Sequence, residues 1–341
     1  MTTPTRPRVL VTIPMFAEVL AQLGRQFEVD APCGTATHID WTAETLATRA
    51  QGAAGLLVAG TPRIDAALLA AVPSLRAVCS MAVGYNNIDL PACTAAGVLV
   101  SNAPDVLTET TADFGFALMM ATARRIAESE HFLRAGQWTH WSYDLFAGAD
   151  VHGATLGVLG MGRIGQAIAR RGALGFGMPV LYHNRSRLDA ATEQQLGARW
   201  VDKAGLLREA DHLVIVVPYS PASHHLIGAA ELALMKPTAT LTNIARGGVV
   251  DDAALAQALA DRRIAAAGLD VFEGEPQVHP ALLAVPNVVL TPHIASASLR
   301  TRRAMAELAA ANLVAALAGT PGGGQPPTAL NPQVLPLRAA G

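Results

Sequence analysis

Short apolar runs alternate with alanine-rich helical stretches along almost the whole chain. In the first part of the chain these runs cover residues 9–13, 55–59, 75–80 and 98–102. They are apolar throughout, which is typical of parallel strands buried on both faces. Helical segments such as residues 64–71 separate them. The alternation predicts βαβ units around a parallel sheet.

A long helical stretch follows at residues 109–135, with no proline and a single glycine. At about 1.5 Å per residue it would span about 40 Å, which suits a bridge between two domains. The loop after it gathers Trp138, Trp141, Tyr143 and Phe146. This cluster fits a hydrophobic clasp within the monomer and a subunit interface equally well.

A second series of strands and helices begins at Thr155 and ends in a helix over residues 298–318. Its predicted strands are residues 156–159, 179–183, 213–217, 239–244, 266–271 and 288–291. The tail from Gly319 is rich in glycine and proline, so we expect poor order at its start.

Composition supports a globular α/β protein of two domains, because 341 residues exceed the usual length of one domain. A hydrophobic content of 51% with a net charge of −2 excludes disorder. The 25 basic residues are balanced by 27 acidic ones without a basic block, which argues against nucleic-acid binding. No apolar stretch is long enough to span a membrane. With no signal-peptide layout, a cytoplasmic protein is expected.

No metal site is expected either. The three cysteines, Cys33, Cys79 and Cys93, form no CxxC pair. His224 and His225 are adjacent, and neighbouring side chains on a helix point about 100° apart.

Three glycines, Gly160, Gly162 and Gly165, form a GxGxxG pattern directly after a predicted strand and at the start of an amphipathic helix. The pattern alone is weak, but this setting is the one that dinucleotide binding requires. Without side chains there, a pyrophosphate can approach the N–H groups at the amino end of the helix. We therefore predict a dinucleotide-binding domain.

The next strand ends in Asn184-Arg185-Ser186-Arg187, where an NAD-preferring site usually has an acidic residue for the ribose hydroxyls. Arginines match a 2′-phosphate instead, so we predict NADP(H) as the preferred cofactor, with NAD(H) possible. An ordinary solvated basic turn is the alternative.

Three polar groups follow later strands: Arg246, Glu275 and His293. In parallel sheets such positions share the edge where ligands bind. Arginine can hold a carboxylate and polarise a carbonyl, and histidine can donate a proton near neutral pH. A carboxylate beside the histidine favours its imidazolium form. The set suits reduction of a 2-keto acid, although each residue singly could be structural.

The chain resembles the D-isomer-specific 2-hydroxyacid dehydrogenases, most closely the glyoxylate/hydroxypyruvate reductases. Beyond the residues above, the resemblance rests on the segments at residues 83–89, 102–105, 108–113 and 156–165, and it covers residues 9–319. One departure is Ala295, where close relatives often have glycine, and this methyl group bears on the choice of substrate.

The resemblance implies two doubly wound parallel-sheet domains, a Rossmann cofactor domain inserted into a flavodoxin-like substrate domain. The limits expected are residues 1–104 with 296–330 for the substrate domain, 105–295 for the dinucleotide-binding domain and 331–341 for a C-terminal tail. It implies a homodimer in which Trp141 reaches the partner's active site, which moves the subunit-interface interpretation ahead.

The resemblance also implies roles for single residues. Arg246 and His293 act on the substrate and Glu275 supports His293, while Asp270 meets the nicotinamide carboxamide. The cofactor contacts implied are Gly162, Arg163, Ile164, Val217, Pro218 and Ile244. Backbone N–H groups of Val83 and Gly84 hold the substrate carboxylate, and we add Ser296 to the substrate residues.

Other functions are compatible with the sequence. Formate dehydrogenases share this fold but have Gln where Glu275 stands, and phosphonate dehydrogenase or 2-ketogluconate reductase are further possibilities. Long phosphoglycerate dehydrogenases need a regulatory domain in place of the short tail. Corepressors that resemble this fold bind NAD(P) and partner peptides, and slow turnover would distinguish them.

Overall fold

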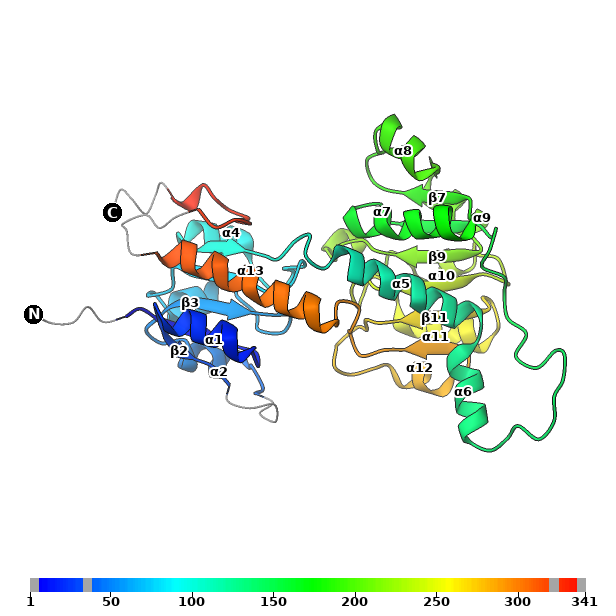
Figure 1. Cartoon of the computed structure of the whole chain (residues 1–341), viewed down its shortest axis with the longest axis horizontal. Helices are drawn as coiled ribbons and strands as arrows, with labels where there is room; N and C mark the ends of the chain where they lie inside the picture. The colour runs from blue at the N-terminus through cyan, green and yellow to red at the C-terminus, as the bar shows by residue number, and fades with distance from the viewer. Residues whose placement is uncertain (1–5, 33–38, 319–324, 336–341) are drawn as a thin grey trace, which may run out of the picture. The chain divides into compact units, whose positions relative to one another are not determined.

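The computed structural model describes residues 6–32, 39–318 and 325–335, and the chain forms two compact units. Unit 1 comprises residues 1–107 and 298–341, and unit 2 comprises residues 108–297. Unit 2 is therefore inserted into the sequence of unit 1 (Figure 1). Each unit is built on a parallel sheet with helices on both faces, which confirms the predicted fold class.

Unit 1 contains a five-stranded sheet in the order β2-β1-β3-β4-β5, with every pairing between its strands parallel. This is the flavodoxin-like order. Its elements are β1 (Arg8–Val11), α1 (Ala17–Gly24), β2 (Glu28–Asp30), α2 (Ala43–Arg49), β3 (Ala53–Val58), α3 (Ala66–Ala71), β4 (Ala77–Ser80), α4 (Leu90–Ala95), β5 (Leu99–Ser101) and α13 (Leu299–Leu317).

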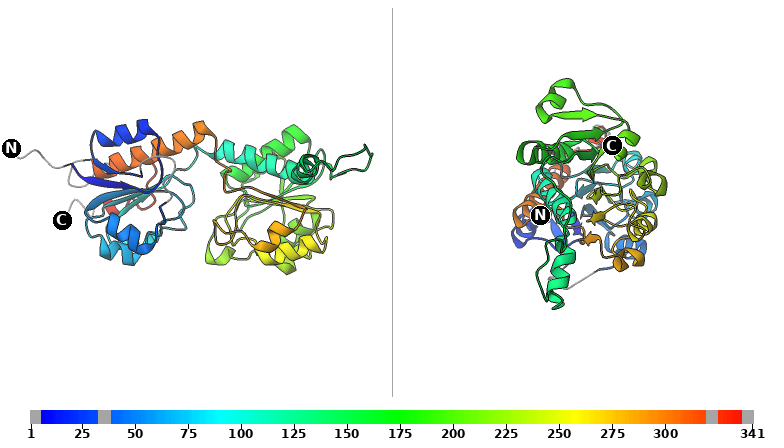
Figure 2. Two further views of the ribbon diagram at one scale, coloured as in Figure 1. Left: turned by 90° about the horizontal axis from the view of Figure 1, so that it is seen from below. Right: turned by 90° about the vertical axis from the view of Figure 1, so that its right-hand side faces the viewer.

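Helices α1 and α13 lie on one face of this sheet and α2, α3 and α4 on the other (Figure 2). Leu56, Val78 and Val100 face the second group, where they pack with Leu68 and Cys93. Because both faces are covered, the central strands are apolar on both sides, as the sequence pattern predicted.

The chain after α13 returns to the edge of this sheet. Residues 319–324, where we expected poor order, lie outside the described part of the chain. Beyond them, Ala329 forms an antiparallel bridge with Ser101, and the Asn331 side chain accepts the Val100 N–H at 2.7 Å. Asn331 and Val334 are fully buried, so the predicted domain limit at residue 330 falls inside this docked segment.

Unit 2 contains a seven-stranded sheet in the order β12-β11-β10-β9-β6-β7-β8, also parallel throughout. This is the Rossmann order with one further strand. Its elements are α5 (Thr108–Ala123), α6 (Ile126–Arg134), β6 (Leu156–Leu159), α7 (Arg163–Arg170), the π-helix η1 (Arg171–Gly175), β7 (Val180–His183), α8 (Ala190–Leu196), β8 (Ala198–Trp200), α9 (Lys203–Glu209), β9 (His212–Ile215), the 3₁₀ helix η2 (Pro221–Ser223), α10 (Ala229–Leu232), β10 (Thr240–Asn243), α11 (Asp252–Ala260), β11 (Ala266–Leu269), α12 (Pro280–Ala284) and β12 (Val288–Leu290).

Each face of this sheet has its own hydrophobic core. Val158 and Val214 pack against α5 and α7, whereas Leu159, Leu213 and Ile215 pack against α9 to α12. Successive side chains of a strand point to opposite faces, so both cores draw on the same short runs.

The single helix predicted over residues 109–135 is wrong. The chain forms α5 and α6, separated by Arg125 in the left-handed conformation with φ of 54°. The backbone crosses the end of α5 at Gly148, and the Ala149 N–H donates to the Ala123 carbonyl at 2.9 Å. This contact caps the helix, and both helices lie within unit 2, so neither is a bridge between the units.

Strands β2 and β8 were not predicted from the sequence. Both are edge strands of three residues with charged or half-buried side chains. An edge strand is partly exposed, and its sequence therefore lacks the apolar run that marks a central strand.

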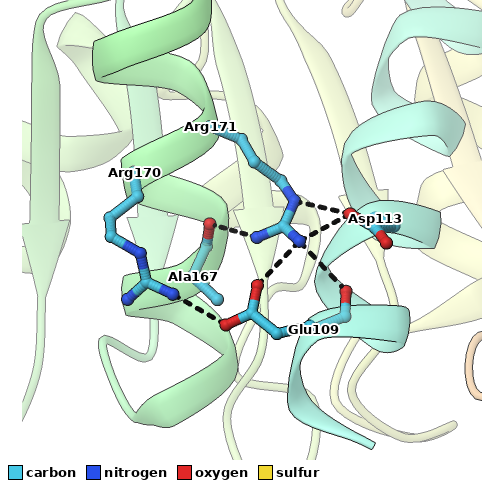
Figure 3. A network of polar contacts seen from close by, with 5 residues as sticks. All are labelled: Glu109, Asp113, Ala167, Arg170 and Arg171. Carbon is cyan, nitrogen blue, oxygen red and sulfur yellow. Dashed lines mark hydrogen bonds and ion pairs between the residues drawn. The ribbon is translucent and has the colours of Figure 1, made fainter. Parts of the chain in front are cut away.

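Helices α5 and α7 are joined by a network of ion pairs (Figure 3). Glu109 of α5 accepts from Arg170 at 2.7 Å and from Arg171 at 2.8 Å. Asp113, one turn later, accepts from Nε of Arg171 at 2.8 Å. The network fixes the carboxyl end of α7, whose amino end carries the glycine-rich loop. Among the helices of residues 6–32, 39–318 and 325–335, none has both the length and the apolar composition of a membrane span.

Candidate active site

The glycine-rich loop connects β6 to α7, and two of its three glycines are required by close contacts with the backbone. Gly160 has φ of +103°, and a Cβ there would lie 2.8 Å from the Val216 backbone. A Cβ on Gly165 would lie 2.2 Å from the Gly160 carbonyl oxygen, so this glycine lets the helix pack on the loop. A Cβ on Gly162 would meet nothing within 4 Å, and no side chain caps α7 there. The amino end of α7 therefore fits a pyrophosphate.

The end of β7 holds this loop in place. The Gly160 N–H donates to the His183 carbonyl at 3.0 Å, and the Met161 N–H donates to Oδ1 of Asn184 at 2.6 Å. Asn184, predicted to contact the cofactor, thus supports the loop that would hold it. Arg163 and Ile164 are the first residues of α7.

Arg187 forms an ion pair with Glu193, a residue that was not predicted to be part of the site. Its guanidinium donates to both carboxylate oxygens of Glu193, at 2.8 and 2.7 Å. The Tyr182 hydroxyl donates to the same carboxylate at 2.7 Å. A phosphate would have to compete with this ion pair for Arg187. This ion pair could have been suspected from the sequence, because Glu193 lies in the first turn of α8, six positions after Arg187.

Arg185 and Ser186 are exposed at the same turn. Within the described ranges, no hydrogen bond or ion pair joins Arg185 to another residue. Of the two arginines at this turn, Arg185 is the one free to meet a phosphate. Val217 and Pro218 follow β9 and Ile244 follows β10, at the same edge of the sheet.

Glu275 and His293 are in direct contact, although 18 residues separate them in the sequence. Oε2 of Glu275 lies 2.7 Å from Nδ1 of His293, and Oε1 accepts the Phe272 N–H at 2.9 Å. Burial raises the pKa of Glu275, but the hydrogen bond and charge of His293, the Phe272 N–H and the charge of Arg246 together hold it below its ordinary value. The carboxylate is therefore ionised near neutral pH.

Arg246 follows β10 on the same edge of the sheet and is half-buried. Burial lowers the pKa of Arg246, and the nearby Glu275 carboxylate opposes that shift. A guanidinium stays charged near neutral pH even so. Its Nη1 donates to the Ala245 carbonyl at 2.7 Å. The charge of Arg246 thus acts on the carboxylate that contacts His293.

Asp270 is fully buried and organises the segment that carries His293. Its Oδ1 accepts from the Thr291 hydroxyl at 2.7 Å and the Ile294 N–H at 2.8 Å, and its Oδ2 accepts the Ala295 N–H at 2.8 Å. The His293 N–H donates to the Asp270 carbonyl at 2.9 Å. The predicted contact of Asp270 with a carboxamide stays a prediction.

His293 itself has φ of 52°, in the left-handed region that residues other than glycine seldom adopt. The Asp270 contacts on both sides of the residue hold this conformation, and the side chain remains 45% exposed. Ala295 is buried and Ser296 half-buried in the same turn. The imidazole can therefore reach a ligand while its backbone is held.

Comparison of the sequence with known proteins identifies the same family as the motifs did. The model of the D-isomer specific 2-hydroxyacid dehydrogenase NAD binding domain matches residues 116–295. A glyoxylate reductase of Thermococcus onnurineus is 44% identical over 340 residues, covering 98% of this chain and 99% of the relative. A glyoxylate reductase of Aeropyrum pernix is 45% identical over 348 residues, with 98% and 99% covered.

The chain belongs to the D-isomer specific 2-hydroxyacid dehydrogenase family. A solved structure of an NADPH-dependent glyoxylate/hydroxypyruvate reductase from Sinorhizobium meliloti, in complex with NADP and malonate, matches with a TM-score of 0.82 and 35% identity. The match covers 97% of this chain and 98% of that one. The resemblance stated from the sequence motifs is confirmed, and unit 2 contains the NAD-binding domain of the family.

Two of the residues predicted to bind substrate lie in unit 1 of this dehydrogenase. Val83 and Gly84 follow β4, at the carboxyl edge of the five-stranded sheet. The Asn102 side chain donates to the Val83 carbonyl at 2.8 Å and holds this turn. Arg246, Glu275, His293 and Ser296 belong to unit 2.

Trp141 lies in the loop after α6 and is 77% exposed. Trp138 and Tyr143 of the same loop are also exposed, while Phe146 packs edge to face with Phe132 of α6. Of the aromatic residues in this loop, Phe146 packs within the monomer, whereas the two tryptophans are exposed.

Proposed function

We propose that this dehydrogenase reduces small 2-keto acids, with glyoxylate and hydroxypyruvate as the leading substrates, and that NADPH is the preferred cofactor. The relatives of Thermococcus onnurineus and Aeropyrum pernix, named glyoxylate reductases, support the substrate class. Their matches extend over nearly the full length of both chains, so they include the residues of both units.

The contact between Glu275 and His293 is the observation that carries the proposed chemistry. Because Nδ1 of His293 faces the carboxylate, Nε2 is the nitrogen left to donate a proton to the substrate oxygen. The Glu275 carboxylate holds the ring in the orientation needed for that transfer.

Arg246 supplies the positive charge that holds a 2-keto acid by its carboxylate and polarises the carbonyl group. The backbone N–H groups of Val83 and Gly84 and the Ser296 hydroxyl are proposed as further substrate contacts. The nicotinamide cofactor, when bound, supplies the hydride that this carbonyl carbon accepts.

The glycine loop and the turn after β7 are proposed to hold that cofactor. Gly160, Gly162 and Gly165 leave room for the pyrophosphate, and Arg163 and Ile164 present the amino end of α7. Val217, Pro218 and Ile244 line the cofactor side of the sheet edge, and Asp270 is proposed to meet the carboxamide. Preference for NADPH rests on Arg185, with no acidic residue between Asn184 and Leu188 to bind a ribose hydroxyl.

A homodimer is proposed as the working unit, with the exposed Trp138, Trp141 and Tyr143 at its interface. Sedimentation of the purified protein tests it, and a monomer at micromolar concentration contradicts it. The free thiol of Cys93 suits a reducing compartment, which supports the cytoplasm as its location.

The deciding experiment measures kcat/KM for glyoxylate, hydroxypyruvate, pyruvate and 2-ketogluconate, each with NADPH and with NADH. We expect glyoxylate or hydroxypyruvate with NADPH to give the highest value. A higher value for 2-ketogluconate overturns the substrate assignment, and a higher value with NADH overturns the cofactor assignment. Turnover too slow to saturate with any of the four acids contradicts an enzymatic role for this site.

A further inference from the structure

A second cluster of ionisable side chains lies outside the residues assigned to substrate or cofactor. His224 and His225 stand between η2 and α10, and Glu273 follows β11. One ring nitrogen from each histidine and one carboxylate oxygen of Glu273 lie within 4.8 Å of one another. All three side chains are exposed, so an ion could reach them from solvent.

The local backbone places the two histidines side by side. The 3₁₀ helix η2 ends at Ser223, and His225 has φ of 48°. The two rings consequently stack, with centroids 3.9 Å apart and an angle of 22° between their planes. His224 and His225 are therefore not on a helix, where their side chains would diverge, and the prediction that excluded this pair on that ground is wrong.

The surrounding contacts hold both partners of the cluster in place. The His225 N–H donates to the Gly248 carbonyl at 2.7 Å, which fixes the segment after η2. The Glu273 N–H donates to Oδ2 of Asp252 at 3.0 Å, which fixes the opposite segment. A cluster held from both sides loses little conformational freedom when it binds a ligand.

Each histidine has one ring nitrogen near an outer partner. Nδ1 of His224 lies 3.2 Å from the Tyr219 hydroxyl, and Nδ1 of His225 lies 3.7 Å from Oδ2 of Asp251. Nε2 of His225 lies 2.9 Å from the Glu273 carboxylate. Metal-binding histidines show this division, in which one nitrogen binds the ion and the other meets an oxygen that orients the ring.

We infer that His224, His225 and Glu273 form a binding site for a divalent transition-metal ion of the zinc class. Two imidazoles and a carboxylate suit zinc, and sites with three protein ligands leave a fourth position for water. With bonds of about 2.0–2.2 Å, tetrahedral ligand atoms lie about 3.3 Å apart. Nε2 of His225 and the Glu273 carboxylate are 2.9 Å apart, close to this value, and all three ligand atoms lie within 4.8 Å of one another, so rotations of the exposed side chains can complete the site.

The site is distinct from the proposed reaction, and its test does not depend on activity. Zn²⁺ binding to full-length, tag-free protein stripped with a chelator is measured by isothermal titration calorimetry. The variants are His224→Gln, His225→Gln and Glu273→Gln, and the matched control is His131→Gln, an exposed histidine of α6.

We expect one Zn²⁺ per chain in the wild type and in His131→Gln, with affinity at least tenfold weaker in each cluster variant. Co²⁺ bound to the wild type should show the visible absorption bands of tetrahedral coordination, and this readout needs no variant to fold. Absence of Zn²⁺ binding by the wild type overturns the inference. Equal affinity in the wild type and the three cluster variants overturns it as well, because the ion would then bind elsewhere.

Discussion

Oε2 of Glu275 lies 2.7 Å from Nδ1 of His293, and the other oxygen of the same carboxylate accepts the Phe272 N–H. The glutamate is thus oriented by its own loop and in turn orients the imidazole. This pair joins two segments that follow neighbouring strands, β11 and β12, of the parallel sheet.

His293→Ala should lower kcat by about 10²–10⁴-fold, because the proton for the substrate oxygen is then no longer supplied. Binding of NADPH, followed by fluorescence titration, should change little. His131→Ala, at an exposed position of α6, is the control. A kcat within threefold of the wild type would refute the proposed acid.

Asp270→Asn should impair the enzyme through the conformation of the His293 segment. The carboxylate accepts three hydrogen bonds, and the amide nitrogen of Asn would face an N–H or hydroxyl donor in place of one oxygen. A buried donor left unpaired costs about 1–3 kcal/mol, measurable as the free energy of unfolding in urea. Both stability and kcat should fall, and unchanged stability would contradict this positioning role.

Arg185→Ala and Arg187→Ala separate the two arginines at the end of β7. Arg185→Ala should raise KM for NADPH by about tenfold or more with little effect on KM for NADH, because only NADPH carries the 2′-phosphate. Arg187→Ala should have the smaller effect on KM for NADPH, since its guanidinium is bound to Glu193. An equal change in KM for NADPH and for NADH in Arg185→Ala would indicate that this turn has a structural role only.

Arg246→Lys should raise KM for the keto acid sharply, because a compact ammonium cannot reproduce the two-pronged contact with a carboxylate. Steady-state kinetics at saturating NADPH measures it. An unchanged KM would place the substrate carboxylate elsewhere.

Cys93 should resist alkylation in the folded protein. Burial, with a smaller contribution from the Asp89 charge, raises its pKa to about 12. Because the thiolate is the reactive form and the pKa is raised, very little of the Cys93 thiol is ionised at pH 8.5. Iodoacetamide at that pH should label Cys93 only after unfolding in urea, as read by peptide mass spectrometry. Equal labelling of folded and unfolded protein would contradict it.

The residue pattern was enough to predict the fold class and the type of chemistry at the site. Buried central strands such as β6 need continuous apolar runs, and glycines at Gly160 and Gly165 are required by steric contacts that no other residue tolerates. Arg246, Glu275 and His293 could be selected because each follows a strand of a parallel sheet, and such ends share one edge.

Contacts that depend on where segments distant in sequence meet could not be predicted from the residue pattern and are seen only in the folded chain. The division of α5 from α6 follows from the backbone that crosses at Gly148, and the ion pair of Arg187 with Glu193 follows from the packing of α8. Likewise, the stacking of His224 on His225 depends on a backbone conformation that residue types do not specify. Periodicity reports which side of an element is buried, whereas a polar contact depends on the position of each partner in three dimensions.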